Sequence, residues 1–261
     1  MPNSSVPRGR FIWHELLTSD PKSAQSFYTK LIGWGAKAWD KSEDPYIMWT
    51  VDETPLGGLM KLPADAAKAG APPHWLAYVS TPDVDATAAQ VAKLGGSTVL
   101  KPMDVPTVGR VAVFSDPQGA IFGVYCPDKG TPDVDQEPKP GEFSWHELTT
   151  TDHEAALKFY ATLFGWEKSE ALDMGAMGIY QMYGRNGRML GGMFNKTPDM
   201  PMPPNWANYI MVGDINASAA KVKQFGGQVL MGPMEVPGGS WIVQGLDPQG
   251  AAFALHQKAG E

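Results

Sequence analysis

The sequence predicts an α+β fold in which one βαβββ unit is used four times, two units to each of two domains. Three observations support this prediction. The second half of the chain repeats the first, an Asp-to-Gly interval of constant length occurs twice in each half, and short strand-like segments flank every such interval. Strands grouped around single helices in this way are typical of the α+β class.

A tandem duplication relates the two halves of the chain. Residues 9–34 and 141–166 share 14 identities in 26 aligned positions, and residues 95–123 and 226–254 share 12 in 29. The segment between the copies is rich in Pro and charged residues, which is typical of an exposed linker. The expected parts are a first domain over 10–127, a linker over 128–140 and a second domain over 141–257.

Each repeat contains one predicted helix, which lies between an Asp and a Gly spaced 13 residues apart. Asp is a good N-cap because its side chain accepts hydrogen bonds from the first free N–H groups of a helix. Gly suits the left-handed residue that ends a helix. In the first interval four apolar residues fall on one helical face: Ala24, Phe27, Tyr28 and Leu31. The four intervals are Asp20–Gly33, Asp83–Gly96, Asp152–Gly165 and Asp214–Gly227.

A strand-like stretch precedes each predicted helix, and further strand-like segments follow it. The preceding stretches cover residues 11–17, 74–80, 143–149 and 205–212. The segments that follow the first two helices cover residues 46–52, 56–62, 110–116 and 120–126. Each repeat is therefore expected to run β-α-β-β-β.

Composition indicates a soluble globular protein that binds neither nucleic acid nor an anionic membrane. The chain is 43% hydrophobic and carries a formal net charge of −7, whereas nucleic-acid binding rests on Lys and Arg. No apolar run approaches the roughly 20 residues that span a bilayer, and the opening residues have no apolar core like that of a secretory signal. A single cysteine, Cys126, excludes an internal disulfide and a Cys-rich zinc site. We expect a cytoplasmic protein in which this thiol, beside a proline at a strand end, is unreactive.

The repeated unit resembles that of the vicinal oxygen chelate superfamily, which includes glyoxalase I, extradiol dioxygenases and bleomycin-resistance proteins. The matching segments are "TSD…FYTKLIGW", "TPDVDATAAQVAKLGG" and "DVPTVGRVAVFSDPQGAIFGVY", with their counterparts in the second half. The D-P-x-G turn before the last strand of a domain is especially typical. The chain looks most similar to tandem two-domain, glyoxalase-like members, and the resemblance covers residues 10–127 and 141–257.

This resemblance implies two glyoxalase-like domains whose mixed sheets are cupped around cavities. In the metal enzymes of the family a divalent ion lies at the cavity floor and chelates two neighbouring substrate oxygens as a Lewis acid. The usual ligands are a His or Gln on the first strand of a unit and a Glu near the end of its last strand.

Strand parity tests whether those ligands are present, since residues two apart share a face. On the first strands the usual ligand positions fall on Trp13, Leu76, Trp145 and Ala207, and on the last strands they fall on Gly123 and Ala254. None of these side chains binds a metal. His14 and His146 lie one residue after the tryptophans, so we expect them to be buried on the opposite face, beneath a helix. A register slip of one residue would reverse that assignment.

Glu15 and Glu147 share the expected cavity face with the two tryptophans, and we interpret them as candidate catalytic residues. A carboxylate there can act as a general base. Alternatively, it simply bonds a neighbouring Tyr, Trp or backbone N–H. The candidate ligand-binding residues on the cavity face are Trp13, His74, Tyr78, Tyr125, Trp145, Asn205, Tyr209 and His256.

No metal site is predicted, and no cofactor is favoured. A divalent metal remains an alternative through a remade site, either Glu15 with His74 or Glu147 with His256, because zinc and iron accept such ligands. The Gly57-Gly58 and Gly191-Gly192 pairs lack the Lys of a phosphate loop. We interpret them as places where two backbones approach closely at the start of a strand.

Three hypotheses of function follow. The first is a protein that binds a small aromatic or apolar molecule in a sheet-lined cavity, as in the bleomycin-resistance branch. The second is a metal-dependent lyase, isomerase or dioxygenase with a rebuilt site, and the third is a metal-free enzyme with a cavity Glu as base. Whether the chain is an enzyme is left open. We also expect a monomer, because duplication supplies both partners of the single-domain relatives in one chain.

Two points of assembly complete the expectations. The first repeat can pair with the second and the third with the fourth, or the first with the fourth and the second with the third; hydrophobic patterning satisfies both. The two halves are expected to be inequivalent, because the first has His74 and Tyr125 where the second has Asn205 and His256.

Overall fold

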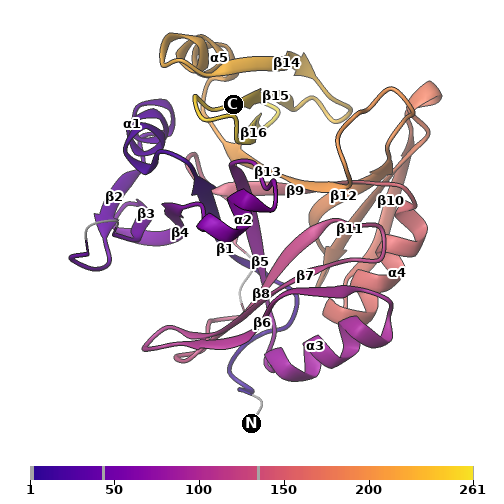
Figure 1. The fold of residues 1–261 in the computed structure, drawn as a ribbon. Coiled ribbons are helices and arrows are strands. Elements are labelled where there is room, and N and C mark those ends of the chain that lie inside the picture. Colours follow the sequence, from indigo (N-terminus) through magenta and orange to yellow (C-terminus); the bar gives the residue numbers. More distant parts are fainter. Residues whose placement is uncertain (1–2, 43–44, 134–135, 261) are drawn as a thin grey trace. The chain divides into compact units, whose positions relative to one another are not determined.

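The computed structural model describes residues 3–42, 45–133 and 136–260 and contains two eight-stranded mixed sheets (Figure 1). The strand order is β2-β3-β4-β1-β5-β8-β7-β6 in the first sheet and β10-β11-β12-β9-β13-β16-β15-β14 in the second. Within the sheets β1 pairs with β4 and β5 with β8 in parallel, whereas the hairpin neighbours are antiparallel. The α+β prediction is confirmed.

The first two repeats each contribute one strand, one helix and three further strands, as predicted. The first repeat consists of β1 (Phe11–Thr18), α1 (Pro21–Ile32), β2 (Gly35–Ala38), β3 (Ile47–Val51) and β4 (Thr54–Lys61), and the short α2 (Ala64–Lys68) follows it. The second consists of β5 (His74–Ser80), α3 (Val84–Lys93), β6 (Ser97–Val105), β7 (Gly109–Ser115) and β8 (Ile121–Pro127).

The third and fourth repeats follow the same order. The third consists of β9 (Phe143–Thr150), α4 (His153–Phe164), β10 (Glu167–Asp173), the 3₁₀ turn η1 (Gly175–Met177), β11 (Ile179–Arg185) and β12 (Arg188–Asn195). The fourth consists of β13 (Asn205–Met211), α5 (Ile215–Gln224), β14 (Gln228–Glu235), β15 (Trp241–Leu246) and β16 (Ala252–Gln257).

The predicted aspartate caps begin all four predicted helices, α1, α3, α4 and α5. Each carboxylate accepts a hydrogen bond from the backbone N–H three residues on, at 2.9–3.1 Å: Asp20, Asp83, Asp152 and Asp214. The predicted apolar face of α1 is also confirmed, because its buried residues are the four expected ones. None of the described helices is long and apolar enough to cross a membrane.

The glycine that ends the helix was predicted correctly in two repeats and wrongly in the other two. Gly33 and Gly165 are left-handed C-caps, with φ of 90° and 72°. In α3 and α5 the left-handed residue is instead the preceding glycine, Gly95 or Gly226. The predicted glycines, Gly96 and Gly227, are instead required for close packing. A Cβ on Gly96, for example, would lie 2.7 Å from the carbonyl oxygen of Ser115.

The chain packs into two compact units that cut across its two halves. Unit 1 comprises residues 1–12, 77–136 and 146–206, and unit 2 comprises residues 13–76, 137–145 and 207–261. The core of unit 1 combines side chains of the second and third repeats, and that of unit 2 combines those of the first and fourth. Hydrogen-bonded sheets therefore follow one of the two expected pairings, whereas core packing follows the other.

The D-P-x-G turns fasten repeats together within each unit. In unit 1, Asp116 accepts hydrogen bonds from the backbone N–H groups of Gln118 and Ala120 and from the hydroxyl of Tyr160, at 2.9–3.0 Å. In unit 2, Asp247 caps its own turn in the same way and accepts from Tyr28 at 3.3 Å. Burial raises the pKa of both carboxyls.

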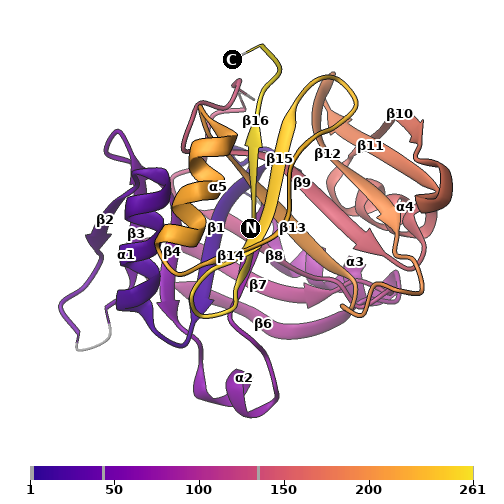
Figure 2. The same cartoon turned by 90° about the horizontal axis from the view of Figure 1, so that it is seen from above.

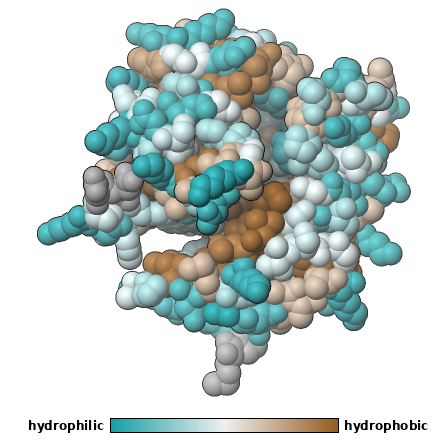
Figure 3. Space-filling view, viewed as in Figure 1, coloured by the Kyte–Doolittle hydropathy of each residue, from teal (hydrophilic) through white to brown (hydrophobic). Residues whose placement is uncertain are grey.

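Helices cover the cores in pairs. Helices α1 and α5 lie side by side in unit 2 (Figure 2), and α3 and α4 lie side by side in unit 1. Figure 3 shows hydrophilic side chains over α5 at the top of the view, next to apolar side chains in the region of β14. Several apolar residues of β14 are indeed exposed, among them Leu230, Met231 and Met234.

Candidate functional site

A chain of hydrogen bonds links the predicted residues Trp13 and Glu15 in unit 2. The indole N–H of Trp13 donates to the hydroxyl of Tyr46 at 2.9 Å, and that hydroxyl donates to Oε1 of Glu15 at 2.9 Å. All three side chains are half-buried. Trp13 and Glu15 therefore share a face of β1, as predicted, and the alternative in which the carboxylate bonds a tyrosine describes Glu15 correctly.

The third repeat has the corresponding tyrosine–glutamate bond in unit 1, whereas its tryptophan, Trp145, belongs to unit 2. The hydroxyl of Tyr180 donates to Oε2 of Glu147 at 2.9 Å. Trp145 is half-buried on β9, two residues before Glu147 and thus on the same face of the strand. The ring of Tyr180 also stacks on Phe194, with centroids 5.9 Å apart and planes at 24°.

The paired glycines make this arrangement sterically feasible. A Cβ on Gly57 would overlap the carbonyl oxygen of His14, so this glycine lets β1 and β4 approach, as predicted. Gly58 serves a different purpose: it is the register partner of Glu15, and a Cβ there would overlap the Tyr46 ring and hydroxyl. In unit 1, Gly192 leaves the same space for Tyr180.

His14 and His146 lie on the opposite face and are buried, as predicted. His14 is 4% exposed and stacks on Phe143, with centroids 3.6 Å apart and planes at 13°. His146 stacks on Phe11 at 3.6 Å and 3°, and its Nδ1 lies 3.3 Å from the carbonyl oxygen of Leu190. Burial lowers the pKa of His146 to about 3, so this imidazole is neutral in the folded protein.

Aromatic or amide side chains cover the positions where the metal enzymes carry their last-strand ligand. In unit 1, Gly123 pairs with Tyr78, and a Cβ on Gly123 would overlap the ring of that tyrosine. In unit 2, Ala254 lies between Tyr209 and Gln244, and the Gln244 amide donates to the Tyr209 hydroxyl at 2.7 Å. Tyr78 and Tyr209 are both buried.

His74 and Asn205 bond their own loops. Nδ1 of His74 lies 2.7 Å from the carbonyl oxygen of Pro72, and the amide of Asn205 donates to the carbonyl oxygen of Pro203 at 2.8 Å. The two residues thus occupy matching positions at the starts of β5 and β13 and make matching local contacts.

The remaining predicted residues lie near the ends of the last strands. The hydroxyl of Tyr125 donates to the carbonyl oxygen of Val108 at 3.2 Å in unit 1. Burial raises the pKa of this tyrosine. Nδ1 of His256 lies 2.9 Å from the hydroxyl of Ser144 in unit 2. Both side chains are half-buried.

The donor set does not fit a metal chelate. Every mapped ligand position carries a side chain without a metal donor, and the space above Gly123 is filled by Tyr78. Within residues 3–42, 45–133 and 136–260, no three or more His, Cys, Asp and Glu side chains gather in a group that could hold an ion. Structural and catalytic zinc sites use at least three such ligands.

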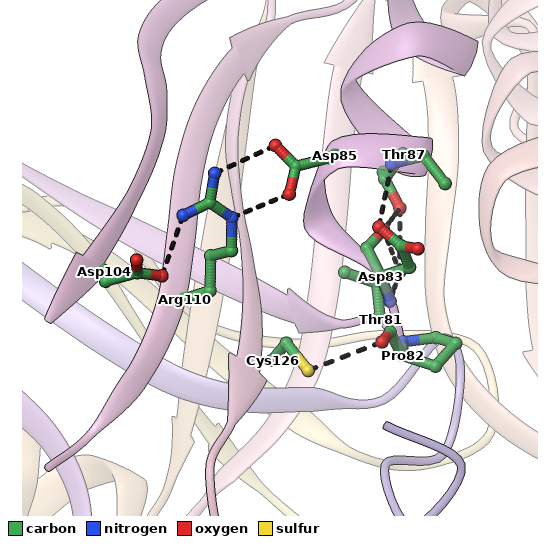
Figure 4. A network of polar contacts seen from close by, with 9 residues as sticks. Thr81, Pro82, Asp83, Asp85, Thr87, Asp104, Arg110 and Cys126 are labelled. Atoms are coloured by element: carbon green, nitrogen blue, oxygen red, sulfur yellow. Dashed lines mark hydrogen bonds and ion pairs between the residues drawn. The ribbon is translucent and has the colours of Figure 1, made fainter. Parts of the chain in front are cut away.

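A polar cavity of about 310 Å³ lies elsewhere, in unit 1. Arg110 there donates two hydrogen bonds to Asp85, at 2.8 and 2.9 Å, and a third to Asp104 at 2.7 Å (Figure 4). The Sγ of Cys126 lies 3.6 Å from the carbonyl oxygen of Pro82, and burial raises the pKa of the thiol. A raised pKa keeps the thiol protonated, which agrees with the expected lack of reactivity.

Tyr46 and Tyr180 were not predicted as site residues. An alignment of 46–49 with 180–183 would have shown a tyrosine two residues before a methionine in both repeats. The sequence alone does not connect this pattern with Glu15. The strand register does, since Met48 pairs with Gly58 and Gly58 pairs with Glu15.

Comparison with known proteins places these features in context. The model of the Glyoxalase/Bleomycin resistance protein/Dioxygenase superfamily matches residues 10–124 and 142–255. "Putative glyoxylase CFP32" of Mycobacterium tuberculosis is 32% identical over 99% of both chains, and "Anthracycline biosynthesis protein DauV" of Streptomyces sp. is 29% identical over 93% of this chain and 91% of that protein. The Mn(II)-bound glyoxalase from Novosphingobium aromaticivorans has a similar fold, with a TM-score of 0.64, 17% identity, and coverage of 98% of this chain and 83% of that one.

Proposed function

We propose that this chain, which belongs to the glyoxalase/bleomycin resistance protein/dioxygenase superfamily, binds a small aromatic or apolar molecule on the glutamate-bearing faces of its sheets, without a chelated metal ion. Fold alone does not decide the chemistry of this superfamily, so the proposal rests on the side chains. It concerns the faces that carry Glu15 in unit 2 and Glu147 in unit 1.

One observation carries the proposal: the first strand of the repeat has a Trp at the usual metal-ligand position and a Glu two residues later, and a Tyr from another strand segment bonds the Glu. Trp13, Tyr46 and Glu15 form a hydrogen-bonded chain on a half-buried face. Aromatic side chains with a few placed polar groups are the usual lining of small-molecule sites. Met48 extends the apolar part of that face, on the same row as Glu15.

The faces of the two halves differ, which supports unequal binding by the two. In the first half the row through Gly123 consists of Tyr78 and Val113, whereas in the second half the row through Ala254 consists of Tyr209 and the polar Gln244. We therefore expect two sites of different affinity for any one ligand.

The names of relatives support a role in small-molecule chemistry. The relative named for anthracycline biosynthesis covers nearly the same length as this chain. The name "putative glyoxylase" of the other relative favours a second candidate function, an enzyme of the metal-dependent type, in which Glu15 or Glu147 would contribute to a rebuilt ligand set.

Metal content and ligand-induced stabilisation separate the two candidates. We expect purified protein to contain far less than one equivalent of Mn, Fe, Ni or Zn by elemental analysis, and chelator treatment to leave its Tm unchanged. A ligand from a library of flat apolar molecules should raise the Tm, since saturation at 100 times Kd adds about 2.7 kcal/mol of stability. The single variants Glu15→Gln and Glu147→Gln and the double variant should weaken the binding of that ligand without lowering the Tm of the free protein.

Stoichiometric metal that is lost on chelation, together with a fall in Tm, would contradict the proposal and favour the metal enzyme. The matched control is Glu154→Gln. This residue is exposed in the first turn of α4, so the substitution changes the charge equally without touching either face.

A further inference from the structure

A carboxylate lies among aromatic and sulfur-containing side chains on one face of unit 2. Glu15 bonds Tyr46, and Tyr46 in turn bonds Trp13, so the carboxylate lies beside two aromatic rings. Met48 occupies the same row of the sheet, across Gly58. These side chains are half-buried rather than sealed in the core, so a ligand from solvent can contact them.

Unit 1 carries the same combination independently. Glu147 accepts from Tyr180, and the Tyr180 ring stacks on Phe194. Met182 lies on the same row as Glu147, across Gly192. The glycines at these positions are required by the tyrosines, because a Cβ on Gly192 would overlap the ring of Tyr180.

Electrostatics favours one charge type of ligand at such a face. A carboxylate in a half-buried, apolar setting attracts a cation more strongly than it would in water, and it repels an anion by the same reasoning. The faces of Trp, Tyr and Phe rings also attract organic cations within about 6 Å of the ring centre. The formal net charge of −7 raises the local concentration of cations around the whole protein.

We infer that the ligand is a lipophilic cation, a protonated amine carried on a flat apolar body. Its ammonium group binds beside the carboxylate of Glu15 or Glu147, and its apolar body lies against the aromatic and methionine side chains. This inference rests on the proposed function, to which it adds the charge of the ligand.

Three naphthalene probes of one size test the charge. They are 2-naphthylmethylammonium, 2-naphthylmethanol and 2-naphthoate, which differ only in a cationic, neutral or anionic substituent. Titration calorimetry at pH 7 and low salt should rank the ammonium first, at least tenfold tighter than the alcohol, with the naphthoate weakest. Added salt should reduce the advantage of the ammonium, because exposed charges are screened.

Variants assign the preference to the two glutamates. Glu15→Gln and Glu147→Gln should each reduce the preference for the ammonium at one of two sites, and the double variant should bring ammonium and alcohol to within about twofold. Glu154→Gln, which makes the same charge change on α4, should leave the preference intact.

The outcomes distinguish failure of the cation inference from failure of the proposed function. Equal binding of ammonium and alcohol by the wild type, or a preference that survives in the double variant, would overturn the cation inference and leave the proposed apolar binding intact. Tightest binding of the naphthoate would also overturn it. If none of the three probes binds at millimolar concentration, both the inference and the proposed function are contradicted.

Discussion

The two buried histidines and the glutamates that follow them show that neighbouring residues of one strand lie on opposite faces of the sheet. His14 and Glu15 are adjacent in sequence, yet the imidazole stacks in a core against Phe143 while the carboxylate bonds Tyr46 on the other face. Alternation along a strand is the cause. The "WHEL" segment is therefore a strand with two faces rather than a cluster of ligands.

Burial of His146 makes stability depend on pH. Its pKa is about 3 in the folded protein and near 6.5 in an unfolded chain, so between these values the unfolded state binds one more proton. Stability is therefore lost as pH falls below about 6.5, by roughly 1.4 kcal/mol per unit from this group.

Denaturant titrations at pH 6.5, 5.8 and 5.0 measure that loss. His146→Leu should reduce the slope of the unfolding free energy against pH by about one proton relative to the wild type, whatever the variant does to stability at pH 7. His153→Leu is the matched control, because it removes a histidine that lies near the surface, at the start of α4 beside Asn195, rather than in a core. Equal slopes for His146→Leu and wild type would show that this histidine titrates normally.

At the scale of elements, strand β4 carries two adjacent glycines with separate roles. A Cβ on Gly57 meets the backbone of His14, and a Cβ on Gly58 meets the side chain of Tyr46. Backbone in a sheet cannot move without breaking the β1–β4 ladder, whereas a side chain can be shortened by mutation. The two positions should therefore respond differently to the same substitution.

Gly57→Ala should cost about 3 kcal/mol of stability, and this cost should be the same in a Tyr46→Ala background. Gly58→Ala should cost about 1–2 kcal/mol alone and much less when Tyr46 is already Ala. Urea unfolding of the wild type, the three single variants and the two double variants provides the two cycles. A cost at Gly58 that Tyr46→Ala does not relieve would show that Tyr46 does not occupy the space beside it.

At the scale of the whole molecule, the two halves of the sequence depend on each other. Tyr28 of the first repeat packs against Phe253 of the fourth, and Phe122 of the second packs against Tyr160 of the third. Each core therefore draws on both halves. The same duplication supports the expectation of a monomer, whose mass by light scattering should be near 28.2 kDa.

Residues 1–133 or 134–261 alone should not give a folded monomer, because each fragment exposes half of two cores. Co-expression should restore a complex of about the intact mass that unfolds cooperatively. Size-exclusion chromatography with light scattering, followed by thermal unfolding, measures both. A fragment that is monomeric and unfolds near the Tm of the intact chain would contradict this dependence.

The repeats, the helix starts and the faces of the strands could be predicted without the structure, because these features depend on local rules. Asp caps a helix through its own neighbours, and parity along β1 separates His14 from Glu15 without knowledge of any other strand. The helix ends were predicted less well, since Gly96 and Gly227 are required by packing against a distant strand rather than by a left-handed turn.

Which repeats share a core, and which side chains bond the glutamates, could not be predicted, because both depend on contacts between distant parts of the chain. Both pairings of repeats bury the same apolar residues, so hydrophobic pattern cannot choose between them. The Trp13–Tyr46–Glu15 chain depends on the register of three strands and on the space above Gly58, and the partners lie up to 33 positions apart in sequence. Contacts of that kind have no local signature, because they arise from where strands meet rather than from the residues beside them.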